Sequence, residues 1–337
     1  MLAYASPFLL LASVPSFFIF LGPAGPLLTI GLLLLALVGS EAISVRGPVP
    51  RPAGSTQLYQ LLPMIYVILQ LAITLWAIAA TAHASVLGYV SLVFAIGVTT
   101  GVFGILCAHE LVHGKDRLSH AFGTLMLTAM CYRHFRIAHI YGHHRYAGTA
   151  RDCATARLGE SFYAFLARTV SGQWREAWQQ ERMRVRRTKK SLLANRVFGD
   201  CLVMLVIFAL LYLVWGWRGP VFLLSESAVG VIVLELFNYI AHYGLVRHVD
   251  ARGRAEPFGE AHSWNSSNVI ANTIIFNMGR HSDHHKRPSV SYEELRYLSK
   301  APELPAGYAG SILLAAIPPL WRRLMDPAVR DLNANRA

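Results

Sequence analysis

Long apolar runs constrain the fold of this chain more than any other feature. A helix of about 20 apolar residues spans the roughly 30 Å hydrocarbon layer of a bilayer, and it satisfies its own backbone hydrogen bonds there. The chain is also 54% hydrophobic and only 15% charged, which is too apolar for an ordinary water-soluble domain. We therefore expect a single all-α, polytopic membrane domain over residues 1–337, with about six transmembrane helices. The six runs lie at residues 7–22, 27–45, 57–80, 84–106, 197–217 and 220–242.

The basic residues predict how these helices are oriented. Of the 31 lysines and arginines, sixteen lie in residues 107–196 and twelve follow residue 243. With six spans, these segments share one side with Arg46 and Arg51, and Arg218 falls on the other side. By the positive-inside rule we expect a multi-pass protein of the cytoplasmic (inner) membrane with both termini in the cytoplasm. The cytoplasmic segments 107–196 and 243–337 are expected to be largely helical and packed beneath the bundle.

The formal net charge of +12 raises the question of an acidic partner. The densest basic tract, at residues 182–190, includes Arg184, Arg186 and Arg187. No nucleic-acid-binding module accompanies this tract, which argues against nucleic acid as a partner. We expect the tract to face the anionic headgroups of the lipid bilayer or to bind an acidic protein.

Nine of the 14 histidines fall into four compact clusters, far more imidazole than one zinc site needs. Imidazole is a common metal ligand, so the clusters predict a metal centre with several ions. The runs 84–106 and 220–242 both end on the cytoplasmic side, where they deliver His109, His113 and His242. All nine can therefore meet in one layer beneath the bilayer. The candidate metal ligands are His109, His113, His139, His143, His144, His242, His281, His284 and His285.

The spacing within the clusters favours two neighbouring metal ions. His109 and His113 are four residues apart, an interval that places both side chains on one face of an α-helix. His139 and His143 repeat this four-residue interval. His144 is adjacent to His143, and adjacent helical residues point about 100° apart. Neighbours that diverge in this way suit two ions better than one. The last cluster, at residues 281–285, repeats the same arrangement.

Two carboxylates are candidates for supporting catalysis. Glu235 lies inside the last apolar run, and a carboxylate within a membrane helix is costly enough to suggest a function. The alternative is that Glu235 is paired with an arginine or a backbone group in a packed interface. Asp283 lies among the histidines of the last cluster and could orient an imidazole. In the run 84–106, Gly97 and Gly101 predict close helix packing near the first cluster.

Two remote alternatives follow from single features of the sequence. Residues 109–113 match the His-Glu-x-x-His signature of zinc proteases, with Glu110 as general base. A membrane zinc protease would use two of these histidines and one further ligand, which leaves the other clusters unexplained. A metal transporter would place its ligands along a path near the membrane midplane, whereas these clusters are expected at one face.

Five motifs, in order over roughly residues 100–297, resemble those of the integral-membrane alkane 1-monooxygenases. These enzymes belong to a wider superfamily of membrane fatty acid desaturases and hydroxylases. Together the five motifs are far more specific than any one of them. They are His109-Glu110-Leu111-Val112-His113, the His-x-x-Gly-His-His of residues 139–144, Asn238-Tyr239-x-x-His242-Tyr243-Gly244, His262-Ser263-Trp264-Asn265-Ser266 and His281-Ser282-Asp283-His284-His285.

The resemblance implies a non-haem di-iron monooxygenase in which the nine histidines hold two iron ions. Such an enzyme uses O2 to hydroxylate the terminal carbon of an alkane or alkyl chain. The resemblance also implies rubredoxin as electron donor, with an NAD(P)H-dependent reductase; this chain has no dinucleotide-binding fingerprint and no Cys-x-x-Cys pair. A di-iron desaturase, or a hydroxylase of another lipid or alkyl-aromatic substrate, remains an alternative. His262 is expected to act as scaffold rather than ligand.

Two positions depart from the family pattern. The family usually carries glutamate where this chain has Ala138 and Ala241. If those carboxylates orient imidazoles or relay protons in relatives, Asp283, Asp152 or Glu235 would have to do so here. The departures leave open a substrate other than a simple n-alkane.

An alkyl substrate has no polar group for the protein to bind, so its site is expected to be an apolar cavity within the helix bundle. The metal centre would lie at the inner end of that cavity. Bulky side chains are candidates for setting its depth. They are Trp76, Phe94, Phe103 and Phe237.

Overall fold

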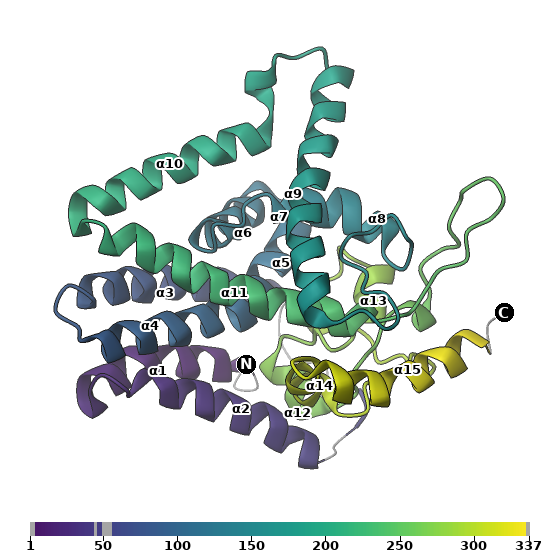
Figure 1. Cartoon of the computed structure of the whole chain (residues 1–337), viewed down its shortest axis with the longest axis horizontal. Helices are drawn as coiled ribbons and strands as arrows, with labels where there is room; N and C mark the ends of the chain where they lie inside the picture. Colours follow the sequence, from purple (N-terminus) through teal and green to yellow (C-terminus); the bar gives the residue numbers. More distant parts are fainter. Residues whose placement is uncertain (1–3, 44–45, 49–55, 335–337) are drawn as a thin grey trace.

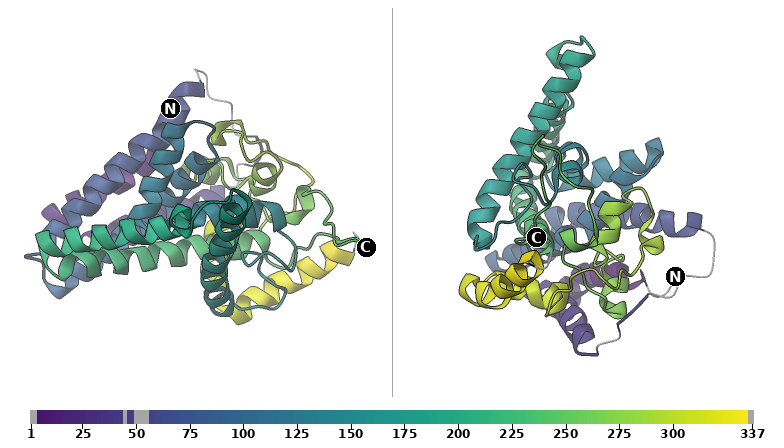
Figure 2. Two further views of the ribbon diagram at one scale, coloured as in Figure 1. Left: turned by 90° about the horizontal axis from the view of Figure 1, so that it is seen from above. Right: turned by 90° about the vertical axis from the view of Figure 1, so that its right-hand side faces the viewer.

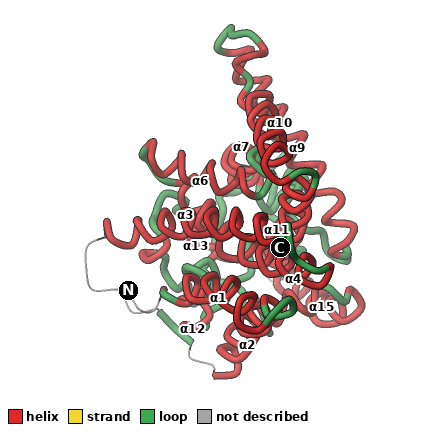
Figure 3. The backbone as a smooth tube through the Cα atoms, turned by 90° about the vertical axis from the view of Figure 1, so that its left-hand side faces the viewer, coloured by secondary structure: helices red, strands yellow, loops and turns green. Residues whose placement is uncertain are grey.

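The computed structural model describes residues 4–43, 46–48 and 56–334 of the chain. Within these ranges the backbone forms helices joined by loops, and the only strand-like pairings are isolated bridges (Figure 3). The prediction of an all-α fold is therefore confirmed. Arg51, which was expected in a cytoplasmic loop, lies outside the described residues.

All six apolar runs form helices. In the described residues, five helical segments are long and apolar enough to cross a membrane, and the 16-residue α1 is a shorter apolar helix. The fourth segment is longer than expected, because α4 continues through a π-helical stretch, η2, into α5 without a break. The helices are α1 (Ser6–Leu21), α2 (Pro26–Ile43), α3 (Thr56–Ala80), α4 (Val86–Thr99), η2 (Thr100–Gly104), α5 (Ile105–His113), α10 (Arg196–Trp215) and α11 (Arg218–His242).

Glycines allow the fourth segment to pack tightly against α11, as the sequence predicts. A Cβ atom on Gly97 would lie 2.7 Å from the carbonyl oxygen of Glu226, and one on Gly101 would lie 2.7 Å from that of Gly230. Distances this short exclude any larger residue without a shift of the backbone. The close packing fixes α5 and α11 relative to each other, so that the two helices finish at the same end of the bundle (Figure 1).

Between the fourth and fifth spans, the chain forms a set of shorter helices and then a long polar one. The helices α9 and α10 form an open hairpin, whose tip projects from the body of the protein (Figure 2) and whose two helices diverge below it (Figure 1). Side-chain caps define the hairpin: Ser161 accepts a hydrogen bond from the amide of Ala164, and Asn195 accepts from Val197 and Phe198. The elements are α6 (Arg117–Ala129), α7 (Phe135–Ile137), η3 (Ala138–His143), α8 (His144–Tyr146), α9 (Phe162–Arg187) and η4 (Leu192–Ala194).

The segment after α11 is less helical than expected. From residue 243 to residue 306 the described backbone is mostly loop, with four short helices, so the prediction of a largely helical segment is wrong there. Asparagine, serine and glycine are frequent in this stretch, and they favour turns over helix. The helices after α11 are η5 (Glu260–His262), α12 (Val269–Ile274), α13 (His281–Lys286), η6 (Tyr292–Glu294), α14 (Gly307–Ala315) and α15 (Pro318–Ala334).

Candidate metal centre

The structure brings all nine predicted ligands together in two neighbouring groups. In each group, the candidate ligand atoms all lie within 4.8 Å of one another. The histidines come from the fourth span, the η3–α8 segment, α11 and α13, and the clusters that lie far apart in sequence thus converge. The first group is His109, His113, His139, His144 and His284; the second is His143, His242, His281 and His285.

A π-helix sorts the second histidine cluster between the two groups. In the π-helical segment η3, residues five apart share a face, because each turn is wider than in an α-helix. His139 and His144 therefore meet in the first group, with their Nε2 atoms 2.9 Å apart. His143, four residues after His139, points to the second group. Adjacent histidines thus diverge, as the sequence predicts, but the pair that shares a face differs from the expected one.

The last cluster is divided by an ordinary α-helix. In α13, His281 and His285 are four residues apart and both belong to the second group, with Nε2 atoms 3.1 Å apart. His284 points to the first group, where its Nε2 lies 3.2 Å from that of His144. His242, at the end of α11, completes the second group at 3.1 Å from the Nε2 of His281.

The two groups fit metal ions better than they fit a hydrogen-bonded core, because five ring nitrogens converge in one group and four in the other, more than pairwise hydrogen bonds require. Imidazole nitrogens that share an ion at about 2.1 Å lie roughly 3 Å from each other. The Nε2–Nε2 distances of 2.9–3.2 Å match this value. Burial also lowers the pKa of His139, His144, His281, His284 and His285 well below the usual value. These rings are therefore neutral at pH 7, the state in which histidine binds a metal.

One carboxylate contacts the histidines directly. Asp152 Oδ2 lies 2.8 Å from Nδ1 of His143, and both side chains are buried. Asp152 also accepts hydrogen bonds from the hydroxyl of Thr155 and the amide of Ala154. Burial alone would raise the pKa of Asp152, but His143 and these hydrogen bonds lower it below its usual range. Of the three acidic residues considered as replacements for the glutamates at positions 138 and 241, Asp152 is the one placed against an imidazole.

The other two predicted carboxylates lie elsewhere. Asp283 forms an ion pair with Arg287 and accepts a hydrogen bond from the amide of Arg296, so its described partners are not imidazoles. Glu235 is fully buried and accepts hydrogen bonds from side chains of α9 and α11. The ring of His262 is hydrogen-bonded to the carboxylate of Glu256 and accepts a hydrogen bond from the amide of Gly259. The carbonyl oxygen of His262 lies 3.4 Å from Nδ1 of His242. This position agrees with the expectation that His262 supports the centre without being a metal ligand.

Glu110 does not occupy the position of a protease general base. Its carboxylate accepts a hydrogen bond from the amide of Tyr292, in the segment that follows the last histidine cluster. Its neighbours His109 and His113 share their group with three further histidines, rather than with a single third ligand. The geometry therefore argues against the zinc protease alternative. A transporter path is equally unsupported, because the histidines gather where two spans end.

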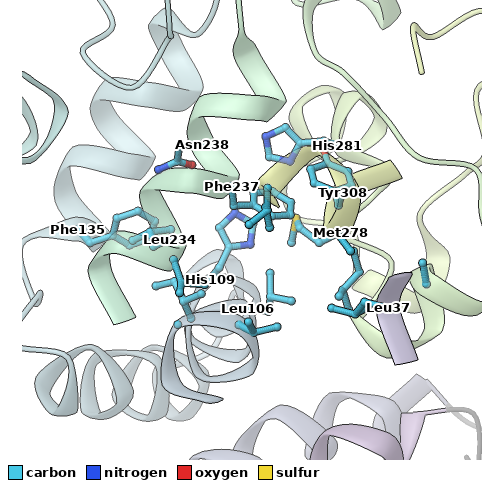
Figure 4. Close-up of a pocket in the computed structure, with 18 of the residues that line it drawn as sticks. Leu37, Leu106, His109, Phe135, Leu234, Phe237, Asn238, Met278, His281 and Tyr308 are labelled. Atoms are coloured by element: carbon cyan, nitrogen blue, oxygen red, sulfur yellow. The ribbon is translucent and has the colours of Figure 1, made fainter. Parts of the chain in front are cut away.

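An apolar pocket adjoins the histidines (Figure 4). It encloses about 790 Å³, its mouth included, and lies among α2, the η2–α5 segment, α11, α12 and α14. His109, His139 and His281 reach its wall from the metal centre. Of the four bulky candidates for setting its depth, Phe237 lines the pocket and the other three are absent from its described wall. Other lining residues include Leu37, Leu106, Leu234, Asn238, Met278, Tyr308 and Ile312.

Aromatic rings pack against the centre, and of those described here the sequence singles out Phe237. Phe135 stacks on His139 with ring centroids 4.7 Å apart, and Phe258 stacks on His285 at 4.5 Å. Phe237 stacks on Tyr308 at 4.5 Å, with the rings nearly parallel. Phe135 and His139 are four residues apart, but the other two contacts join residues far apart in the sequence, so no local pattern predicts those two.

Two further openings are lined by α9 and the η3–α8 segment. One, which we call the polar cleft, reaches His143 and Asp152 and is also lined by Gln173, Arg175 and Glu176. The other is a basic groove on α9 and the neighbouring segments. It is lined by Tyr141, Arg145, Gln180, Glu181, Met183, Arg184, Arg187 and Arg196.

Comparison with known proteins places this arrangement in a family. Residues 83–312 match the model of the fatty acid desaturase family. The chain is 36% identical over 310 residues to alkane 1-monooxygenase 2 of Pseudomonas aeruginosa, an alignment that covers 90% of this chain and 82% of the relative. It is 41% identical over 255 residues to alkane 1-monooxygenase 1 of the same organism, which covers 74% of this chain and 65% of that relative.

A more distant relative shows the breadth of the group. The hydroxylase component of xylene/toluene monooxygenase from Pseudomonas putida is 28% identical over 312 residues, which cover 91% of this chain and 82% of the relative. The described fold, the two histidine groups and these similarities agree. The chain belongs to the fatty acid desaturase family, among its alkane 1-monooxygenases.

Proposed function

We propose that this protein is a membrane di-iron monooxygenase that hydroxylates the terminal carbon of an alkane or alkyl chain. The observation that carries the proposal is the contact between two histidine groups and one apolar pocket. Metal ions that activate O2 would be held by the first, and an unfunctionalised alkyl chain would bind in the second. The relatives named as alkane 1-monooxygenases support the same reaction.

The donor set supports two ions, one in each group. Nitrogen ligands alone are compatible with iron as well as with zinc, and the family resemblance favours iron. When bound, the two iron ions would supply the activation of O2. The chain itself holds the rings in place: Asp152 fixes the tautomer of His143, and Phe135 and Phe258 restrict the rings of His139 and His285.

The pocket determines which part of the substrate reaches the metals. Its described wall is apolar apart from the histidines, Asn238 and Tyr308, whose hydroxyl already donates to the carbonyl oxygen of Trp264. An alkyl chain would bind there by burial of apolar surface, about 0.8 kcal/mol for each CH₂ group. Because Phe237 and Tyr308 narrow the space beside His281, a slim terminal methyl group would enter more easily than a branched one.

Electrons would come from a rubredoxin-type protein, reduced by an NAD(P)H-dependent reductase. The basic groove on α9 suits an acidic donor, since its one acidic residue, Glu181, is already engaged by Arg184 and Arg196. We place this groove on the cytoplasmic side of the inner membrane, in agreement with the positive-inside rule. Lipid headgroups are the alternative partner for the same charges.

The main alternative is a desaturase, or a hydroxylase of another lipid or alkyl-aromatic substrate. Expression in cells with rubredoxin and its reductase, fed a panel of alkanes, alkylbenzenes and fatty acids, separates these functions by product. A terminal alcohol supports the proposal, whereas an alkene without added oxygen supports a desaturase. Metal analysis of the purified protein should find about two iron ions per chain; stoichiometric zinc without iron would rule out the oxygenase.

A further inference from the structure

The fourth span contains one extra residue between the face that packs on α11 and the first pair of histidines. The π-helical turn η2 interrupts its α-helix: the amide of Ile105 donates to the carbonyl oxygen of Thr100, five residues back instead of four. Each residue of an α-helix turns the chain by about 100°, so the extra residue rotates α5 back by about 100° relative to α4. The turn therefore determines which side chains of α5 face the metal centre.

Gly101 marks the face of the span that lies against α11, since a Cβ atom there would be 2.7 Å from the carbonyl oxygen of Gly230. In an unbroken α-helix, His109 would point about 80° away from Gly101 and His113 about 120° away. The extra residue of η2 reduces both angles to about 20°, one on each side of Gly101. In agreement with this, Gly101 and His109 line the same apolar pocket, whose wall includes residues of α11.

Without the π turn, the wrong side chains would face the centre. Ala108 and Val112 each precede one of the two histidines. In an unbroken α-helix they would take the directions that His109 and His113 now have. Neither alanine nor valine binds a metal ion. The first group would then keep only the ligands from other segments, which are His139, His144 and His284.

Two side chains of α3 contact the start of this turn. Nε2 of Gln70 donates to Oγ1 of Thr100 at 3.0 Å. The hydroxyl of Tyr66 lies 3.3 Å from the carbonyl oxygen of Thr99 and 3.0 Å from Oε1 of Gln70, and its ring packs edge-on against Phe103. Tyr66 and Gln70 are both 0% exposed. A π turn is rare within an α-helix, and polar contacts shielded from water favour the backbone shape that they fit.

We propose that Tyr66 and Gln70 stabilise η2 and thereby direct His109 and His113 toward the first metal position. They act through the backbone of the fourth span and do not touch an ion, so they are positioning residues. The inference rests on one part of the proposed function, the binding of a metal ion by the first histidine group. If the two residues only packed α3 against the fourth span, their loss would lower stability without turning α5.

The test combines the double change Tyr66→Phe and Gln70→Leu with deletion of Val102, a half-buried residue of η2. The double change removes the polar contacts, so α5 should turn and the purified protein should retain about half of the wild-type metal, because only the first group loses ligands. Deletion of Val102 leaves an unbroken α-helix in which α4 and α5 keep their directions. The deletion alone should therefore keep the full metal content, and it should restore that content to the double variant.

Elemental analysis for iron and zinc, and titration of the metal-free protein with Co²⁺, measure the metal content. Thr74→Val is the matched control and should keep all of its metal, because Thr74 accepts a hydrogen bond from Gln70 and its described contacts do not include η2. Thermal unfolding in detergent shows that each variant is folded. If the double variant does not fold, Gln70→Leu alone is compared with and without the deletion.

The outcomes separate this proposal from the proposed function. A folded double variant with full metal content overturns the proposal, as does a deletion that itself loses metal or fails to restore it. Restoration by the deletion would not follow from a packing role, since the deletion replaces none of the lost contacts. If the wild type holds zinc and forms no oxygenated product, the proposed function fails, while the metal content of the variants still tests the role of η2.

Discussion

Asp152 holds His143 in one orientation: its Oδ2 atom lies 2.8 Å from Nδ1 of the imidazole. Nδ1 then carries the proton, and Nε2 is left to face the second histidine group, where it has no hydrogen-bond partner among the described residues. A carboxylate in this position raises the basicity of the ligand and fixes its tautomer. Among the three acidic candidates, Asp152 is thus the one that contacts an imidazole, and that imidazole belongs to the second group.

Replacing Asp152 by asparagine should weaken metal binding. The amide can accept the same hydrogen bond but carries no charge, and loss of such a partner typically costs about 10–100-fold in metal affinity or activity. Metal competition with a chelator, followed by iron analysis, measures the change. Asp283→Asn is the matched control, since Asp283 pairs with Arg287 instead of an imidazole. Equal losses of metal affinity in both variants would show that negative charge near the centre supports metal binding, rather than the contact with His143.

Shortening Phe237 should change substrate selection. Phe237→Ala opens the pocket beside His281, so bulkier or branched alkyl chains should gain relative to slim ones. A pocket contact of this kind is worth about 1–3 kcal/mol, which corresponds to a change of roughly tenfold or more in the ratio of kcat/KM values. Phe94→Ala provides the control, because that side chain is 46% exposed and lies outside the described pocket wall. Unchanged selectivity in F237A would mean that the pocket is not the substrate site.

Charge reversal on the outer face of α9 should weaken use of an acidic donor. Arg184 is unsuitable for this test, because it binds Glu181 and the carbonyl oxygen of Ala194 and its loss would disturb the hairpin. The double change Arg186→Glu and Arg187→Glu spares that contact and should raise the KM for the donor several-fold at low salt. High salt should remove most of the difference.

The same reversal at Arg322 and Arg323 of α15 controls for net charge. Both residues are exposed and lie outside the basic groove. If this variant raises the KM for the donor as much as the α9 variant, the groove is not the docking site. If neither variant changes it, the arginines of α9 face lipid.

The junction of α9 and α10 should make stability depend on pH. Burial alone would raise the pKa of Glu181, but hydrogen bonds from Arg184 and Arg196 outweigh it and lower the pKa to about 2. A carboxyl group with a lowered pKa stabilises the fold above its ordinary value of 4.5, and this contribution is lost as the pH falls toward 2. Glu181→Gln should therefore cost about 1.5–3 kcal/mol of stability at neutral pH.

Thermal unfolding in detergent measures this effect. The difference in Tm between wild type and E181Q should shrink as the pH is lowered from 7 to 3. Glu260→Gln, in a half-exposed pair with Lys286, should change Tm little at either pH. A Tm difference for E181Q that is independent of pH would assign the loss to packing.

The sequence predicts the membrane helices well, because apolar run length determines them almost directly. It also predicts that His143 and His144 serve different ions, since adjacent side chains on any helix diverge. The sequence does not predict that His139 and His144 share a face. The α-helical interval of four residues does not apply in a π-helix, and no residue type shows where a π-helix forms. The backbone of residues 243–306 is likewise hard to predict, because it is held by contacts with distant segments, such as those of Trp264 with Ala241 and of Asn268 with Ser40, rather than by local periodicity.

Contacts between distant residues account for the remaining differences. The sequence offers three acidic candidates for orienting an imidazole. Asp152 contacts one because the chain turns after His143 and brings its carboxylate back to that ring. Asp283 lies among the histidines in sequence, yet α13 turns its carboxylate toward Arg287. The apolar pocket combines six parts of the chain, and of the bulky residues proposed from the sequence only Phe237 lines its described wall.

Turnover under ¹⁸O2 tests the central claim most directly. Purified protein containing iron, supplied with reduced donor and an alkyl substrate, should yield a terminal alcohol with one ¹⁸O atom in each molecule. An alkene without labelled oxygen, or an alcohol whose oxygen comes from water, would contradict the assignment of this histidine centre as a monooxygenase.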